Sequence, residues 1–260
     1  MFTKEIKEAA EAFLAQGRKE YVPQLSVDCV ILSFHEDQLK VFLLHPNGQT
    51  AWMLPGGYVR HQDNLDDAAN RVLFERAGLK DIFLKQFHTF GSKDRVLGKE
   101  VKEMCVHGGI DPALADWVAK RFITVGYYAL VNYDDMKPNP DIFTQEFTWA
   151  DIHRLPEMMV DHGEIVEKAL CTLQKDLLSQ PIGMNLLPDS FTISDLQKLY
   201  ESILGRPIDR GNFRKKMLKS NVLKKLDEQK KGQPHRSPYL YTFDEDQYKQ
   251  SLQEEVKVGF

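Results

Sequence analysis

The chain has 260 residues, of which 42% are hydrophobic, and a formal net charge of −4 at pH 7. This length accommodates one large domain or two smaller ones, and the hydrophobic content is ordinary for a soluble globular protein. No apolar run approaches the roughly 20 residues of a membrane span, so we expect no membrane partner.

The cysteines and the N-terminal segment indicate a cytoplasmic protein. Cys29, Cys105 and Cys171 are far apart and odd in number, a pattern that fits neither a metal-binding pair nor a disulfide framework. We expect three buried thiols in a reducing cytosol. The segment MFTKEIKEAAEAFLAQG carries acidic residues and lacks the apolar core of a signal peptide.

Charge is distributed unevenly along the chain. Residues 206–236 contain 11 Lys and Arg residues but only 3 Asp and Glu residues, a local charge of +8 that leaves −12 for the remainder. A basic patch on an otherwise acidic protein indicates that one part of the chain binds a polyanion.

The first half of the chain predicts a helix followed by a series of strands. Thr3 is a suitable cap for a helix that continues to about Gln16 and stops at Gly17. Runs of β-branched and apolar residues then predict strands. These strands are expected at residues 26–34, 39–45, 82–90, 122–131 and 143–149. Tyr127 and Tyr128 alternate on one of them, so one of the two should face inward.

Residues 54–79 predict a strand end, a glycine turn and a helix. We expect Gly56 and Gly57 to adopt backbone geometry that other residues resist. The helix should run from about Asn64 to Ala77 and stop at Gly78.

One face of this helix carries charged residues whose role the sequence leaves open. Arg71 and Glu75 are four residues apart and share that face. Mg²⁺ needs oxygen ligands, and Glu75 with Asp63 nearby is a weak candidate site, whereas Arg76 adds a cation beside it. One interpretation is slow residual catalysis with Glu75 as the general base. The other is an ion pair between Glu75 and Arg71 that holds the loop to the helix.

Residues 96–120 do not fit the alternation of strands and helices. They predict an inserted loop with a short helix at about residues 112–120. A long loop at a sheet edge can be a lid, a binding loop or a simple insertion, and these alternatives stay open.

The next segment predicts a helix that links two domains. Residues 161–178 place apolar side chains at helical spacing, namely Ile165, Ala169, Leu173 and Leu177. The predicted organisation is an N-terminal helix (1–20), a first domain (21–160), a linker helix (161–180), a second domain (181–246) and a helical tail (247–260).

The second domain has the outline of a winged helix-turn-helix. Thr192 or Ser194 can cap a helix over residues 193–205. After a break, Asp209 caps a basic helix over residues 210–221. A hairpin with a basic tip follows, formed by residues 222–227 and 238–243.

The basic helix and the hairpin tip predict contact with double-stranded DNA; a solvated basic face is the alternative. Most contacts should be to phosphate. Asn212 and Arg214 are the candidates for base edges, because Asn suits adenine and Arg suits guanine. Phe213, Met217 and Leu218 are expected in the core. The predicted DNA contacts are Arg210, Asn212, Arg214, Lys215, Lys216, Lys219, Lys231 and Arg236.

These motifs resemble the Nudix-related transcriptional regulators, in which a Nudix-fold sensor precedes a C-terminal winged helix. The stretch PIGMNLLPDSFTISDLQKLYESILGRPIDRGNFRKKML and the wing SPYLYTF are similar to the family's DNA-binding domain. TFGSKDR and TVGYYAL are similar to the strands that flank its effector pocket. The resemblance covers about residues 20–243, with residues 96–120 as the main departure.

Residues 57–79 also resemble the Nudix signature G-x5-E-x7-R-E-U-x-E-E-x-G-U, in which U is apolar. The residues that match are Gly57, Arg71, Leu73, Glu75, Gly78 and Leu79. The residues that replace family glutamates are Asp63, Val72 and Arg76. The resemblance implies a scaffold that keeps ligand binding and has lost its metal chemistry.

The resemblance implies an α/β (α/β/α sandwich) Nudix fold with a C-terminal winged helix-turn-helix, acting as a homodimer on a palindromic operator. The effector would be ADP-ribose, a related nucleotide or a sugar such as arabinose. No cofactor is expected, and Mg²⁺ only if hydrolase activity remains. The alternative is a Nudix hydrolase that cleaves a nucleoside diphosphate derivative with Mg²⁺. The candidate effector-binding residues are Gly56, Gly57, Arg60, Arg71, Glu75, Phe90, Lys93 and Arg95.

Overall fold

The computed structural model describes residues 3–80, 82–95, 98–112, 115–116, 119–138, 144–179, 183–229 and 238–248. The chain forms two compact units. The first contains residues 1–32, 41–129 and 135–169, and the second contains residues 33–40, 130–134 and 170–260. Helix α5 (His162–Ser179) contributes residues to both units. In the described part of the chain, no helix is long and apolar enough to cross a membrane.

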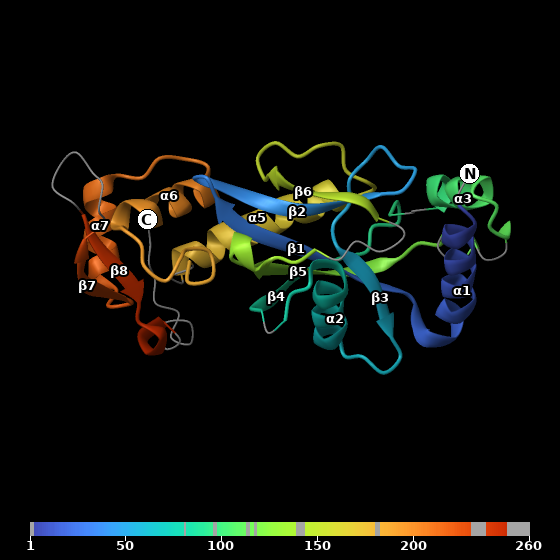
Figure 1. The fold of residues 1–260 in the computed structure, drawn as a ribbon, viewed down its shortest axis with the longest axis horizontal. Helices are drawn as coiled ribbons and strands as arrows, with labels where there is room; N and C mark the ends of the chain where they lie inside the picture. Colours follow the sequence, from blue (N-terminus) through green and yellow to red (C-terminus); the bar gives the residue numbers. More distant parts are fainter. Residues whose placement is uncertain are drawn as a thin grey trace. The chain divides into compact units, whose positions relative to one another are not determined.

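The first unit is built on a six-stranded sheet in the order β4-β5-β1-β2-β6, with β3 paired to β1 (Figure 1). The strands are β1 (Tyr21–His35), β2 (Gln38–Pro46), β3 (Gly56–Arg60), β4 (Leu84–Phe90), β5 (Ile123–Leu130) and β6 (Thr144–Asp151). β3 runs antiparallel to β1, with Gly57 opposite Val27 and Gly56 opposite Asp28. All the predicted strands are present, and β3 is an addition in the segment for which the sequence predicted a glycine turn.

Both faces of the sheet are covered, because residues 26–33 of β1 are buried without a break. Successive side chains of a strand point to opposite faces. Cys29 lies against helix α2 (Leu65–Ala77), with its Sγ 4.0 Å from the carbonyl oxygen of Ala69. Asp28 points the other way, toward the start of α5. The unit is therefore an α/β/α sandwich.

Because both faces of the sheet are covered, the prediction that only one of the two tyrosines of β5 faces inward was wrong. Tyr127 and Tyr128 are each about 1% exposed, so both are buried, not only one of them. The Tyr127 hydroxyl donates to Asp66 of α2 at 2.7 Å. The Tyr128 ring, on the opposite face, packs near Phe83 and Phe87.

Helix α2 is delimited as the sequence predicts. Asn64 caps it in a capping box with Asp67. Gly78 ends it with a φ of +69°, and a Cβ there would lie 2.4 Å from the carbonyl oxygen of Lys137. Glycine is therefore required at this position both by the backbone conformation and by the available space.

The N-terminal helix and the insertion differ from the prediction. Helix α1 (Lys4–Glu20) is capped by Thr3 but continues through Gly17, the predicted stop. Helix α3 (Gly98–His107) occupies part of the segment predicted as a loop. Figure 1 draws α1 and α3 together, and Gly109 after α3 lies against the Lys7 side chain. Of the predicted helix at 112–120, Pro112, Ala115 and Asp116 are helical, and parts of it lie outside the described residues.

The second unit has the predicted winged-helix elements. It contains helices α6 (Ile193–Leu204) and α7 (Arg210–Lys219) and strands β7 (Leu223–Gln229) and β8 (Tyr239–Phe243), and a 3₁₀ turn η1 (Tyr133–Asp135) lies mostly within it. Thr192 caps α6, because its hydroxyl accepts from the Asp195 N–H at 3.1 Å. The predicted helical tail starts within residues 245–248, and its remainder lies outside the described residues.

The prediction of three buried thiols holds for two of them. Cys29 and Cys105 are buried, whereas Cys171 is exposed. Cys171 lies on α5 between Ala169 and Leu173, which are both buried. Two residues along a helix correspond to about 200° of rotation, so Cys171 faces away from that apolar stripe.

A buried histidine links the loop before β3 to α5. The Nδ1 of His162 accepts the backbone N–H of Leu54 at 2.9 Å. Burial, the largest effect, lowers the pKa of His162 from its ordinary value of 6.5, although Asp28 and Asp161 oppose this. The imidazole is therefore neutral in the fold, as its role as an acceptor requires.

This pKa shift predicts a specific acid sensitivity. Below about pH 6.5 the unfolded imidazole binds a proton that the folded one does not, so the free energy of unfolding should fall as the pH falls. His162→Asn keeps an acceptor but does not titrate, so its stability should decline less between pH 7 and pH 5. Urea denaturation at each pH measures this, with the exposed His61→Asn as a matched control. Equal slopes for wild type and His162→Asn would contradict the assignment.

Candidate DNA-binding surface and effector site

Helix α7 presents a basic, exposed surface. Its buried side is formed by Phe213 and Met217, which are four residues apart. The remaining side is polar and exposed. The exposed residues are Arg210, Asn212, Arg214, Lys215, Lys216 and Lys219, which are the DNA contacts predicted on this helix. Leu218 is 41% exposed, so its predicted place in the core was wrong.

The turn between α6 and α7 is pinned by side chains of α6. Gln197 Nε2 donates to the carbonyl oxygen of Ile208 at 3.0 Å, and Glu201 Oε1 accepts the Ile208 N–H at 2.8 Å. The Tyr200 ring meets the Phe213 ring edge to face at 5.2 Å. These contacts fix the position of α7 next to α6.

The wing is an antiparallel hairpin that pairs with the segment before α6. β7 and β8 pair from Leu223↔Phe243 to Gln229↔Tyr239. An isolated bridge joins Phe191 to Tyr241 and extends this small sheet. The predicted wing-tip contacts Lys231 and Arg236 lie outside the described residues.

Arg71 is the centre of an ion network on the exposed side of α2. Its Nε and Nη2 both lie 3.0 Å from Asp63 Oδ2, and its Nη1 lies 3.3 Å from Glu75 Oε2. Its Nη2 also donates to the carbonyl oxygen of Tyr58 at 2.8 Å. The Arg71–Glu75 pair of one interpretation is thus present, but it lies within α2. The contacts that hold the preceding loop and β3 to the helix are those of Arg71 with Asp63 and Tyr58.

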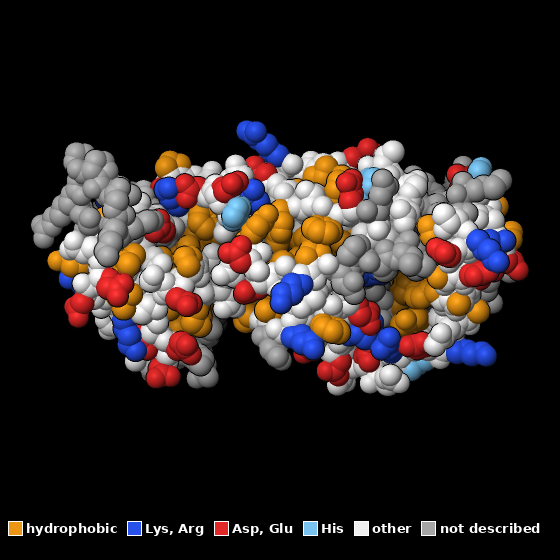
Figure 2. Space-filling model, viewed as in Figure 1, with side chains coloured by type: hydrophobic (Ala, Val, Ile, Leu, Met, Phe, Trp, Pro, Cys, Tyr) orange, Lys and Arg blue, Asp and Glu red, His pale blue; other side chains and the backbone are white. Residues whose placement is uncertain are grey.

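Arg60 extends the network away from α2. Its Nη2 lies 3.7 Å from Glu75 Oε1, and its Nε lies 2.8 Å from Glu20 Oε1. Figure 2 shows acidic and basic side chains interspersed over the region of α2 and β3. The charges of this surface therefore largely neutralise one another.

The donor set at this place does not suit a divalent cation. Asp63 and Glu75 already bind the guanidinium of Arg71. Val72, which replaces a family glutamate, is 1% exposed in the core. Among the described side chains, no three His, Cys, Asp or Glu residues lie together as a metal site. Mg²⁺ prefers several oxygen ligands that are free to coordinate it, and this arrangement lacks them.

Gly56 and Gly57 are required by close packing and not by unusual dihedrals. Neither has a positive φ, which corrects the predicted reason for their presence. A Cβ on Gly56 would lie 2.3 Å from Asp28 Oδ1, and a Cβ on Gly57 would lie 2.6 Å from Val72 Cγ2. The two glycines let β3 approach β1 on one side and α2 on the other.

Arg95 belongs to a buried cluster that the sequence did not reveal. The side chain was predicted to line the effector site, but the residue is 4% exposed. Its Nε donates to Asp161 Oδ2 at 2.7 Å, and its Nη2 donates to Asp28 Oδ2 at 3.1 Å. An aspartate within the apolar strand SVDCVIL was the available signal, because a buried carboxylate needs a partner.

Phe90 and Lys93 lie at the end of β4. Phe90 is half-buried, with its ring 4.8 Å from that of His88, and Lys93 is exposed. Hence the predicted effector residues fall into three groups. Arg60, Arg71 and Glu75 form the ion network on α2. Gly56 and Gly57 lie on β3, where Gly56 packs against Asp28, the partner of Arg95. Phe90 and Lys93 lie together at the end of β4.

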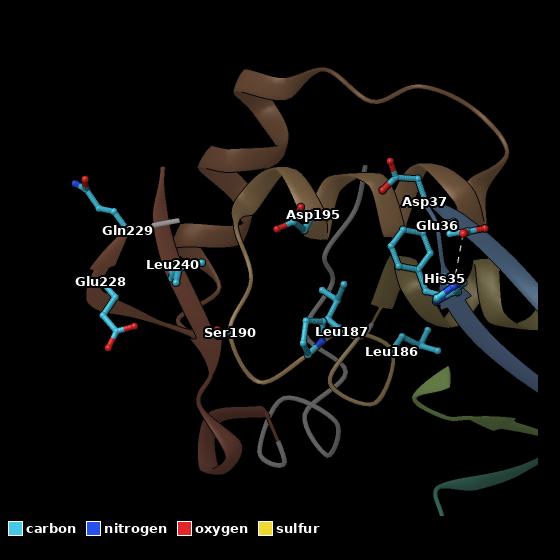
Figure 3. A pocket seen from close by; sticks show the side chains of 12 residues that line it. His35, Glu36, Asp37, Leu186, Leu187, Ser190, Asp195, Glu228, Gln229 and Leu240 are labelled. Carbon is cyan, nitrogen blue, oxygen red and sulfur yellow. Dashed lines mark ion pairs between the residues drawn. The ribbon is translucent and has the colours of Figure 1, made fainter. Parts of the chain in front are cut away.

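A pocket of about 660 Å³ lies in the second unit (Figure 3). Leucines form its apolar lining, and acidic side chains such as Glu36, Asp37 and Glu228 surround it. None of the predicted effector residues lines this pocket. Its acidic border does not favour an anionic ligand such as a nucleotide.

Comparison with known proteins identifies relatives of both units. Residues 183–243 match the family described as the NrtR DNA-binding winged helix domain. The chain is 28% identical over 242 residues to the ADPR responsive transcriptional repressor NtrR of Acinetobacter baylyi, covering 90% of this chain and 88% of the relative.

Solved structures share the fold. NrtR of Shewanella oneidensis, crystallised with a 27mer DNA, has a TM-score of 0.66 and 24% identity, covering 87% of this chain and 96% of that one. A MutT/nudix family protein from Enterococcus faecalis has a TM-score of 0.61 and 23% identity, covering 94% and 100%. The chain therefore has the fold of these structures, an α/β/α Nudix domain followed by a winged helix, and its residues 183–243 match the NrtR DNA-binding winged helix domain family.

Proposed function

We propose that this protein is a ligand-responsive transcriptional regulator that binds operator DNA through α7. The observation that carries the proposal is the exposed basic side of α7, which packs against α6 within a segment that matches a DNA-binding domain family. Helix-turn-helix proteins place such a helix in the major groove. In this proposal the protein acts in the cytoplasm as a homodimer that binds a two-fold symmetric operator in double-stranded DNA.

The first unit acts as the sensor, and ADP-ribose is the effector that we propose. The Acinetobacter relative is described as ADPR responsive, and it aligns with 90% of this chain. Arg60, which is partly exposed at the end of the network, is suited to the phosphates of such a ligand because guanidinium groups bind phosphate oxygens in pairs. All three nitrogens of Arg71 are already bound by protein oxygens, so Arg71 positions the neighbouring residues of the site. A free sugar, the other effector class, lacks these phosphates.

Effector binding requires no metal, and the first unit is not an efficient hydrolase. The support is the ion network, in which guanidinium groups hold Asp63 and Glu75. Regulation follows from linkage: an effector that prefers one conformation of the dimer changes operator affinity by its differential affinity for the two conformations.

Substitutions on α7 test the DNA-binding role. Arg214→Ala should weaken operator binding by about 1–3 kcal/mol, the range for a bidentate contact to a base. Lys216→Ala should weaken binding to all duplexes and reduce the salt slope by about 0.9 for one lost phosphate contact. Fluorescence anisotropy at two salt concentrations, with native and scrambled duplexes, measures both.

The exposed Lys4→Ala serves as the matched control, because it removes one cation from the first unit. Its operator affinity should equal that of the wild type. Wild-type affinity in both α7 variants would exclude α7 as the recognition helix.

The metal requirement is tested by calorimetric titration with ADP-ribose. The Kd should be the same in Mg²⁺ and in EDTA, because Arg71 occupies Asp63 and Glu75, the two carboxylates proposed to hold a cation at the ligand phosphates. Tighter binding that depends on Mg²⁺ would show that the ion network opens to admit a metal. Binding of arabinose but not of ADP-ribose would replace the proposed effector by a sugar.

Hydrolysis is tested separately. Incubation of ADP-ribose with Mg²⁺ and the protein should release no AMP above the background, since general base catalysis needs a carboxylate near an activated water. Glu75→Gln should behave identically. Turnover by the wild type that Glu75→Gln abolishes would instead support the hydrolase alternative.

A further inference from the structure

The start of α5 is tied to the sheet by one buried guanidinium. Arg95 donates to Asp161, the residue before α5, at 2.7 Å and to Asp28 of β1 at 3.1 Å. Its Nη1 donates to the carbonyl oxygen of Phe122, just before β5, at 3.3 Å. A single side chain therefore connects β1 and the residue before β5 to the beginning of the helix.

The next residue of the chain provides a second connection. His162 Nδ1 accepts the N–H of Leu54, two residues before Gly56. Asp161 uses Oδ2 for Arg95, whereas its buried Oδ1 has no hydrogen-bond partner among the described residues. The beginning of α5 is thus attached both to the Arg95 cluster and to the loop that leads into β3.

The cluster adjoins the residues predicted to bind the effector. Asp28 packs directly against Gly56, so the position of β3 fixes the position of the carboxylate that Arg95 binds. The Tyr58 ring lies 5.2 Å from the Phe122 ring, and the Tyr58 carbonyl oxygen accepts from Arg71. A displacement of β3 would therefore reach Arg95 through two separate contacts.

The other end of α5 is attached to the DNA-binding elements. Gln174 Nε2 donates to the carbonyl oxygen of Ile203 at the end of α6 at 2.9 Å. Leu173 and Leu177 of the same half are fully buried. One continuous helix thus begins in the first unit at the Arg95 cluster and is fixed in the second unit to α6.

We propose that Arg95 is a positioning residue that couples effector occupancy to α5 through Asp161, and that it does not touch the effector. The inference rests on the proposed function and deepens it. All three Arg95 nitrogens are engaged by protein oxygens, and 4% exposure leaves no surface for a ligand. Ion pairs inside a protein are weakly screened, so a small shift of β3 changes the energy of the pair appreciably.

The test measures how strongly ADP-ribose changes operator affinity, separately from how tightly ADP-ribose itself binds. The coupling factor is the ratio of operator Kd values with and without ADP-ribose. Asp161→Asn keeps the shape of the side chain and removes its charge. We expect the coupling factor to fall toward 1, with ADP-ribose Kd and operator Kd in the absence of ligand both close to wild type.

The control is Glu164→Gln, the same chemical change in the exposed first turn of α5. It should retain the wild-type coupling factor, although it alters the helix dipole interaction equally. Arg95→Lys provides a second variant, because one ammonium cannot hold both aspartates as the guanidinium does. It should lose coupling while it retains ADP-ribose binding.

The outcomes separate this inference from the proposed function. A wild-type coupling factor in Asp161→Asn, or an equal loss in Glu164→Gln, overturns the inference alone. Loss of ADP-ribose binding in Arg95→Lys overturns it as well, because Arg95 would then be an effector contact. A wild-type protein whose operator affinity does not respond to ADP-ribose overturns the proposed function, and the inference with it.

Discussion

The burial of the Arg95 guanidinium is the constraint on which much of the first unit depends. A buried charge is tolerated only when it is paired and hydrogen-bonded, and removal of one partner of a buried pair costs about 3–5 kcal/mol. Asp28 therefore has to face away from α2, and residue 56 has to be glycine because a Cβ would lie 2.3 Å from the carboxylate. Asp161 has to stand immediately before α5. Four distant stretches of sequence meet because one charge needs partners.

Helix α2 keeps the geometry of the Nudix signature although some glutamates of the signature are replaced. Two carboxylates that lie close together need a positive charge between them. In this protein the guanidinium of Arg71 supplies that charge to Asp63 and Glu75, and it also donates a hydrogen bond to the Tyr58 carbonyl oxygen of β3. The loop, the strand and the helix thus keep their mutual positions without a cation.

The sequence predicts most helices and strands but not the long-range contacts between side chains, because the signals for helices and strands are local. Helical periodicity and capping residues are local, so α2, α6 and α7 begin within about two residues of the expected positions. Helix α3 was missed because a short, charged stretch has little apolar periodicity. Asp28 and Asp161 lie 67 and 66 residues from Arg95, and no spacing rule reports such pairs. Gly56 was singled out correctly but for the wrong reason, since a sequence does not distinguish a need for positive φ from a need for space.

The contacts between α6 and the turn before α7 bear on how an effector would act in the proposed function. Gln197 and Glu201 hold the turn before α7, so the recognition helix is already formed and no ligand is required to order it. In the proposed homodimer, effector binding would then change the spacing of the two helix-turn-helix units, because half-site spacing on DNA is a geometric requirement. At the start of helix α5, Asp161 binds Arg95 and His162 accepts a hydrogen bond from Leu54. In its second half, Gln174 donates a hydrogen bond to Ile203. A helix held at both ends is therefore the element through which we propose that a change at β3 acts.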